Sequence, residues 1–164
     1  MPVTPFHFGP GAALAVLARR RVSFVTFCAA NVLIDVESLY NLVTGGFPVH
    51  AFFHSYIGAT LAGIAAVFAV RLARSIARRW ELSNLFGWFD ETNASLVAGA
   101  LIGAWSHVVL DSVMHADIAP FAPFSAANGL YRIVPVDVLH GFCAASAVLA
   151  LALFGWREWR RSDT

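Results

Sequence analysis

Five apolar segments separated by polar turns form the pattern of this chain. Several of them reach the length of about 20 residues that a helix needs to cross the hydrocarbon of a bilayer. A turn at 44–48 contains glycine and proline, the segment 80–92 holds tryptophans and acids typical of a membrane surface, and 114–135 is a proline-containing loop. The pattern predicts a short first helix followed by longer ones, over residues 10–18, 22–43, 50–70, 94–114 and 136–156.

The composition is that of a membrane protein. Of the 164 residues, 59% are hydrophobic and 13% are charged, and the mean hydropathy is +0.68. Soluble domains carry about 25% charged residues. Because the length fits one domain, we expect residues 1–164 to form a single all-α, polytopic membrane bundle of about four to five helices. Cys28 and Cys143 stand alone in apolar segments, which predicts core residues rather than a disulfide.

The charged residues sort by side of the expected bundle. The chain has no lysine, and ten of its eleven arginines lie at segment ends that alternating helices place on one face. The positive-inside rule makes that face cytoplasmic. All six histidines and five of the acids lie toward the other face, together with Arg132. We therefore expect a polar site near the non-cytoplasmic side, with membrane lipids as partners and no nucleic acid.

Helix geometry places these polar residues at similar depths. At a rise of about 1.5 Å per residue, His7 lies roughly 18 Å from Arg19, and Asp35 lies roughly 20 Å from Val22. By the same arithmetic, His107 lies roughly 18 Å from the start of its helix. Five segments therefore deliver imidazoles or carboxylates to one layer in the outer part of the bilayer.

The strongest candidate pair is His107 and Asp111, which lie four residues apart inside an apolar segment. On a helix they project from the same face, one turn from each other. Such a pair can hold one metal ion, or the acid can orient the imidazole from behind. A hydrogen bond that links two helices is the structural alternative. Ionisable groups at membrane depth are costly unless they pair or bind something, so they indicate function.

Two further pairs offer ligands in the same layer. Asp35 and Glu37 stand about 200° apart on a regular helix, so only one of them is expected to face the centre, and Asp35 is the deeper. His50 and His54 lie four apart at an expected helix start near His50, and they can share a metal. His50 adjoins the turn and is equally suited to solvent, so His54 is the stronger candidate.

The remaining polar residues carry weaker expectations. His7 fits either an interfacial histidine or a ligand at matching depth. We expect His115 and Asp117 to lie in a water-facing loop, and His140 is a weak candidate. Arg132 either anchors a loop to lipid headgroups or clamps an anionic group over a metal, because its guanidinium fork matches phosphate geometry.

Four short motifs follow one another along the chain: Thr4-Pro5-Phe6-His7, Ile34-Asp35-Val36-Glu37, His50-Ala51-Phe52-Phe53-His54-Ser55 and Ser106-His107-Val108-Val109-Leu110-Asp111. Their order resembles that of the inner-membrane-associated metal-dependent hydrolases, the group that includes the LexA-regulated membrane hydrolase. The resemblance covers most of the chain, from His7 to about Pro135, and implies an inner-membrane location. It aligns Arg132 with an arginine of the family, and Glu37 stands where the family has a second Asp. It implies metal-ligand roles for His7, Asp35, His54, His107 and Asp111.

The first functional hypothesis is a membrane-embedded metal-dependent hydrolase. Mixed nitrogen and oxygen ligands suit Zn²⁺, with Mn²⁺ or Fe²⁺ as alternatives. The ion lowers the pKa of a bound water and polarises the scissile group. Glu37 or Asp117 then acts as general base, and Arg132 holds a phosphate or carboxylate of the substrate. The depth of the site favours an amphiphilic or phosphorylated substrate such as a lipid phosphoester.

The second hypothesis is a metal-ion or proton binding or transport protein without hydrolytic activity. Axial ligation of haem belongs to this class, but carboxylates at the same depth favour small hard cations. A transporter also needs a polar route to the arginine-rich face. Between that face and the histidines the sequence offers almost no polar residues except Ser23, Thr26 and Asn31, which favours a site open to one side.

Overall fold

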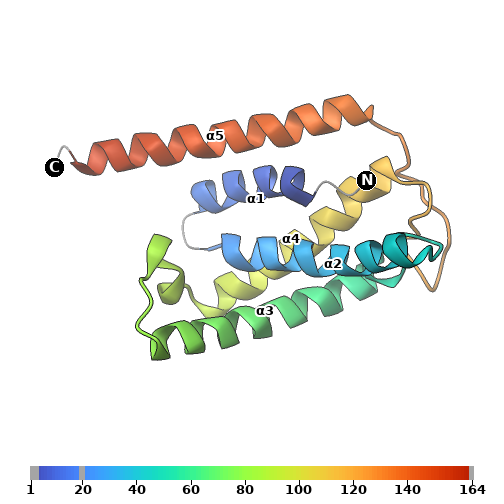
Figure 1. Ribbon diagram of the computed structural model, residues 1–164. Coiled ribbons are helices and arrows are strands. Elements are labelled where there is room, and N and C mark those ends of the chain that lie inside the picture. The colour runs from blue at the N-terminus through green and yellow to red at the C-terminus, as the bar shows by residue number, and fades with distance from the viewer. Residues whose placement is uncertain (1–3, 19–20, 163–164) are drawn as a thin grey trace.

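The computed structural model describes residues 4–18 and 21–162, and all the regular secondary structure over them is helical (Figure 1). The predicted all-α bundle is confirmed. Arg19 and Arg20 of the predicted arginine-rich face lie outside the described residues. The α-helices are α1 (Thr4–Ala18), α2 (Phe24–Thr44), α3 (Tyr56–Arg79), α4 (Asn93–Met114) and α5 (Val136–Ser162), and the 3₁₀ helices are η1 (Phe52–His54) and η2 (Leu85–Asp90).

Hydroxyl side chains fix where three of the helices begin. Ser23 caps α2 by accepting a hydrogen bond from the backbone N–H of Thr26, and Thr92 caps α4 in the same way. Ser55 caps α3 by accepting from the backbone N–H of Gly58. The expectation that this helix starts near His50 is therefore wrong. The chain instead makes the separate turn η1 before Ser55, which places His54 on a short element that can be aimed independently of α3.

Two other helices are longer than the apolar segments predict. α1 begins at Thr4 and accommodates Pro10 within its length, so it includes His7. α5 runs on to Ser162, past the predicted end at Trp156, because arginines such as Arg157 are good helix formers and extend the helix beyond the apolar part. The predicted segment 114–135 is irregular as expected.

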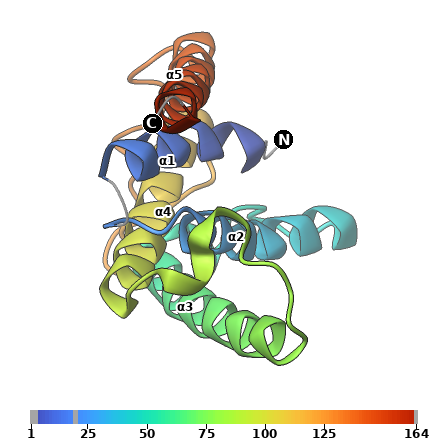
Figure 2. The ribbon, with the colours of Figure 1, turned by 90° about the vertical axis from the view of Figure 1, so that its left-hand side faces the viewer.

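α4 lies at the centre of the bundle and packs against both α2 and α3. α5 packs mainly against α1, and both views show this pair on one side, away from α3 (Figures 1 and 2). The helices alternate in direction (Figure 1). The starts of α1, α3 and α5 consequently share one end of the bundle with the ends of α2 and α4. We call this the histidine end and the opposite one the arginine end.

Glycines allow the central helices to approach closely. A Cβ on Gly99 would overlap the backbone carbonyl of Ser23, and a Cβ on Gly103 would lie 2.7 Å from that of Phe27. Small residues four apart are a common way for helices to pack closely in membranes. The approach brings the backbone of α4 within reach of Asn31 on α2, whose side chain donates to the Gly103 carbonyl at 3.3 Å.

Three of the described helices are long and apolar enough to cross a membrane: Tyr56–Arg79, Asn93–Met114 and Val136–Arg160. α2 has 21 residues, but Asn31, Asp35 and Glu37 lower its hydropathy, so it is not among them. α1 is shorter, as its segment predicts. α2 is therefore less apolar than the three candidate spans because it carries polar residues, some of which lie toward the histidine end.

Candidate metal centre

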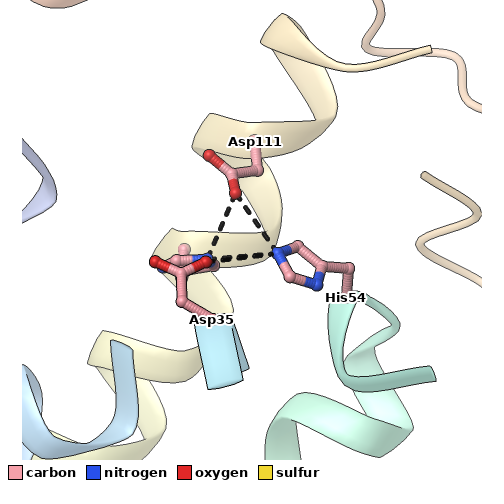
Figure 3. A group of neighbouring side chains, drawn as sticks. Asp35, His54 and Asp111 are labelled. Atoms are coloured by element: carbon pink, nitrogen blue, oxygen red, sulfur yellow. Dashed lines mark hydrogen bonds and ion pairs between the residues drawn. The ribbon is translucent and has the colours of Figure 1, made fainter. Parts of the chain in front are cut away.

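Three separate elements bring four metal-ligating side chains together at the histidine end. α2 supplies Asp35, η1 supplies His54, and α4 supplies His107 and Asp111 (Figure 3). One ligand atom from each residue lies within 4.8 Å of every other. His54, His107 and Asp111 are 0% exposed and Asp35 is 8% exposed. The bundle therefore buries two imidazoles and two carboxylates as one compact group, which we call the four-donor cluster.

Five of the distances between donors in the four-donor cluster are close to those between the ligands of a tetrahedral ion. His107 Nε2 lies 3.2 Å from Asp35 Oδ1, 3.2 Å from Asp111 Oδ2 and 3.3 Å from His54 Nε2. His54 Nε2 lies 3.3 Å from Asp111 Oδ2 and 3.7 Å from Asp35 Oδ1. Ligands held at about 2.0–2.1 Å from a tetrahedral zinc ion lie roughly 3.3–3.4 Å from one another. These residues therefore fit one ion of that kind.

Hydrogen bonds within the protein do not account for Asp111. Both of its carboxylate oxygens are buried, and neither accepts a hydrogen bond of acceptable geometry from a described residue, although three histidines lie within 3.3 Å. A buried carboxylate without hydrogen bonds is costly, because it has lost its hydration without replacement. The nitrogens and oxygens are thus arranged around a shared point rather than as donor and acceptor pairs. A bound cation would satisfy such an arrangement.

Asn31 determines which nitrogen of His107 can bind a metal. The Asn31 side-chain NH₂ donates to the Phe27 carbonyl at 2.8 Å and to the Gly103 carbonyl at 3.3 Å, so its oxygen is turned toward His107. That oxygen lies 2.9 Å from His107 Nδ1 and accepts its proton. Nε2 is then left with a lone pair facing the four-donor cluster. The sequence analysis missed this role of Asn31. Its position one helical turn before Asp35 indicates the same helix face but not the contact with His107.

His7 reaches the same carboxylate from α1. Its Nε2 lies 3.2 Å from Asp111 Oδ1, its Nδ1 lies 3.1 Å from His107 Nδ1, and the residue is only 2% exposed. Thus all five residues predicted as metal ligands converge in the structure. His7 contacts the carboxylate oxygen of Asp111 that does not face His54, so it borders the four-donor cluster rather than completing it.

Asp117 lies beside His50 rather than in the four-donor cluster. Its carboxylate accepts hydrogen bonds from the backbone N–H of Val49 at 3.0 Å and from that of His50 at 3.1 Å. It also lies 2.9 Å from His50 Nδ1. Burial raises the pKa of Asp117, but the hydrogen bonds from His50 outweigh it and hold that pKa below its ordinary value. The carboxylate is therefore ionised at neutral pH and fixes the orientation of the His50 ring.

His115 and Asp117 lie in the loop after α4, as expected, and both are half-buried. The His115 ring stacks on the His50 ring with centroids 4.0 Å apart. Burial and the neighbouring His50 imidazole lower the pKa of His115, which favours its neutral form. Of the two alternatives for His50, solvent or a buried site, the structure shows the buried one, because His50 is only 5% exposed.

Three other candidates lie apart from the four-donor cluster. Glu37 Oε2 accepts a hydrogen bond from the backbone N–H of Phe53 at 2.6 Å, so this side chain holds η1 against α2. Arg132 is exposed, its backbone N–H donates to the Val113 carbonyl at 3.0 Å, and its guanidinium lies over the Tyr131 ring. His140 packs against Phe6. The catalytic roles of Glu37, Asp117 and Arg132 stay predictions.

Comparisons of the chain with protein-family models, curated proteins and solved structures find no match. The interpretation of the site therefore depends on its geometry. Two imidazoles and two carboxylates can hold a divalent cation inside a helical bundle whose helices can span a membrane.

Proposed function

We propose that this protein is a membrane-embedded metal-dependent hydrolase that uses a metal-activated water on a phosphoester or lipid-like substrate. The observation that supports this most directly is the buried four-donor cluster, in which neither oxygen of Asp111 has a hydrogen bond from a described residue. Two nitrogen and two oxygen donors suit Zn²⁺ best, and Mn²⁺ or Fe²⁺ are alternatives. Such an ion supplies a water of lowered pKa and polarises the scissile bond.

The surroundings of the four-donor cluster support access from one side. Asp35 is its only member with appreciable side-chain exposure, 11% against 0% for the other three. Toward the arginine end, Thr26 and Asn31 use their polar hydrogens on backbone carbonyls of α4 and, for one Asn31 hydrogen, of α2 itself. A polar route through the bundle is therefore lacking among these residues. This favours hydrolysis at the histidine end over transport across the membrane.

The proposed substrate follows from the position of the site. The histidine end carries the loop from 115 to 135, and Arg132 is exposed on that loop. An exposed guanidinium on the loop at the same end of the bundle as the four-donor cluster can bind phosphate through two parallel hydrogen bonds. A substrate with a phosphate group and an apolar tail would meet both features from within the bilayer. We place this end at the non-cytoplasmic side of the inner membrane, because the arginine end fits the cytoplasmic face.

The residues around the ion have distinct roles in this proposal. Asn31 keeps the Nε2 lone pair of His107 directed at the ion, and Glu37 fixes η1 and hence His54. The general base must be a carboxylate outside the four-donor cluster, which leaves Glu37 and Asp117 as the candidates. Arg132 would bind the anionic group of the substrate. The motif resemblance to inner-membrane metal-dependent hydrolases supports the same assignment.

A metal-binding protein without hydrolytic activity is the second candidate. One observation favours it: the four-donor cluster already contains four protein ligands, as structural zinc sites do, whereas catalytic sites keep an open position. The two candidates differ in what happens after the metal binds.

The test combines metal content with turnover. Protein purified in detergent is analysed by elemental mass spectrometry and assayed with bis(p-nitrophenyl) phosphate and with phosphatidic acid in mixed micelles. We expect stoichiometric metal and metal-dependent ester hydrolysis in the wild type, loss of both in His107→Ala and Asp111→Ala, and neither loss in the control His140→Ala. Stoichiometric metal without turnover of either ester would favour the second candidate. Folded protein that binds none of Zn²⁺, Mn²⁺ or Fe²⁺ would overturn both.

The general base is tested with isosteric variants. If Glu37 accepts the proton, Glu37→Gln lowers kcat at least about 100-fold with metal content unchanged. If Glu37 only holds η1, the amide oxygen of the glutamine in this variant can still accept from the Phe53 N–H, and kcat stays within a few-fold of wild type. Asp117→Asn is measured beside it, and a large loss of kcat in one variant alone, with its metal content unchanged, identifies the base.

A further inference from the structure

A second group of donors lies next to the four-donor cluster. One ligand atom each from His50, Asp111 and His115 lie within 4.8 Å of one another. The Nε2 atoms of both histidines are buried and have no hydrogen-bond partner among the described residues. His50 is 95% buried, and it comes from the turn before η1, whereas His115 is the C-cap residue of α4. Two buried imidazole nitrogens thus lie near a buried carboxylate without a hydrogen bond from a described residue.

The tautomer of His50 is fixed for metal binding. Asp117 lies 2.9 Å from His50 Nδ1 and accepts its proton, while its other contacts to the backbone N–H groups of Val49 and His50 hold the carboxylate in place. A carboxylate behind an imidazole is the usual support of a metal-ligating histidine, because it fixes the ring and leaves Nε2 as the ligand atom. Simple filling of the core would not require this carboxylate.

Asp111 is the residue that both groups share. Its Oδ2 lies 3.2–3.3 Å from the Nε2 atoms of His107 and His54. Its Oδ1 is a second buried oxygen, which lies 3.2 Å from His7 Nε2 but accepts no hydrogen bond of acceptable geometry from a described residue. The rings of His50 and His54 are in edge contact with centroids 4.8 Å apart, so the two groups adjoin. A carboxylate with two available oxygens between adjoining donor groups can bridge two ions, as in two-metal hydrolases.

We propose that the protein binds a second divalent cation between His50, Asp111 and His115, with Asp111 bridging it to the ion of the four-donor cluster. The second site has three protein ligands, which leaves a coordination position for water or for a phosphate oxygen. The first site has four. The inference rests on the proposed function, and it assigns to the second ion the open position that hydrolysis needs.

The count of bound ions tests this proposal. Detergent-purified protein is loaded with Zn²⁺ or Mn²⁺, freed of excess ion on a desalting column and analysed for metal per chain, with protein measured by amino-acid analysis. We expect two ions in the wild type and in the control His140→Ala, and one in the double variant His50→Ala/His115→Ala. Asp117→Ala keeps the first ion and weakens the second about 10- to 100-fold.

A spectroscopic measurement makes the result independent of activity and of variant folding. The Mn²⁺-loaded wild type should show the paramagnetic resonance spectrum of a spin-coupled pair, and the double variant should show that of an isolated ion. One ion per chain in the wild type, or two uncoupled ions, would overturn the second site. Ester hydrolysis with one bound ion would leave the proposed function standing without this site. Two coupled ions without ester hydrolysis would support the second site and contradict the proposed hydrolase function.

Discussion

The two ends of the bundle both bury charge, but they compensate it differently. At the arginine end, the Arg74 guanidinium donates to the Glu91 carboxylate at 3.3 Å and to the Glu91 backbone carbonyl at 3.1 Å. The same carboxylate accepts from the Ser23 hydroxyl at 2.7 Å. The opposite charges of Arg74 and Glu91 meet directly, and only the Nε of Arg74 lacks a hydrogen-bond partner among the described residues. This network, which ties α3 and the start of α2 to the segment before α4, needs no group from outside the protein.

At the histidine end, the carboxylate of Asp111 has close neighbours but accepts no hydrogen bond from a described residue. Asp111 lies within 3.3 Å of three imidazoles, yet neither of its oxygens accepts a hydrogen bond from a described residue. Asn31 and Asp117 accept hydrogen bonds from the Nδ1 atoms of His107 and His50, respectively. The Nε2 lone pairs of these two histidines therefore face inward. Burial of charge therefore does not by itself distinguish a ligand site from a structural ion pair. The direction of the lone pairs does.

The largest expected difference between the ends is in metal-dependent stability. An ion present at 1,000 times its Kd adds about 4 kcal/mol to the free energy of unfolding. Asp111→Asn removes the charge that both proposed ions share, so we expect it to abolish this gain and to weaken metal binding at least about 1,000-fold. Glu91→Gln at the arginine end should keep the full gain. Thermal unfolding in detergent with metal and with chelator measures it, and equal gains in both variants would contradict the comparison.

A smaller effect is expected from the residue that fixes the tautomer of His107. Asn31→Ala leaves the four donors in place but frees the His107 Nδ1 proton, so we expect metal affinity to fall about 10- to 100-fold. Competition with a chromophoric chelator measures the affinity. The matched control is Asn84→Ala at the arginine end, where the Asn84 side chain bonds Asp90 and should not influence the metal. An unchanged affinity in Asn31→Ala would mean that His107 does not depend on this support.

The smallest effect on metal is expected at the arginine end. Arg74→Met removes the hydrogen bonds to Glu91, which should lower the free energy of unfolding by about 2 kcal/mol. We expect the metal content and the Kd for metal to stay at their wild-type values, because the Arg74 and Glu91 charges compensate each other without an ion. Equilibrium unfolding and elemental analysis of the same samples check both. Loss of metal in this variant would show that the two ends are coupled through α3 and α4.

Much of the fold follows from local patterns. The apolar segments and the polar turns predict the order of the helices, because burial of backbone polar groups in lipid leaves helices as the available structure. Alternation of helix direction then places the described arginines of α3 and α5 at one end and the histidines at the other. The spacing of His107 and Asp111 fixes their common face. These features depend on neighbours along the chain, so the sequence alone suffices to predict them.

The support of the site could not be predicted in this way. Asn31 becomes a partner of His107 because Gly99 and Gly103 allow α4 to approach α2, and nothing in the residues near Asn31 indicates that approach. Asp117 and His50 are 67 residues apart in sequence, and they meet because the loop after α4 folds back over the turn before η1.

The sequence by itself determined the helical class of this protein, the separation of its charges to opposite ends and the residues that can serve as metal ligands. Only the tertiary structure decided which donor atoms lie close together and which of their lone pairs face the same point. The arrangement of these atoms is sensitive to shifts of a few tenths of an ångström between elements that are distant in the chain. Packing of the whole bundle sets these positions, and no local sequence pattern does.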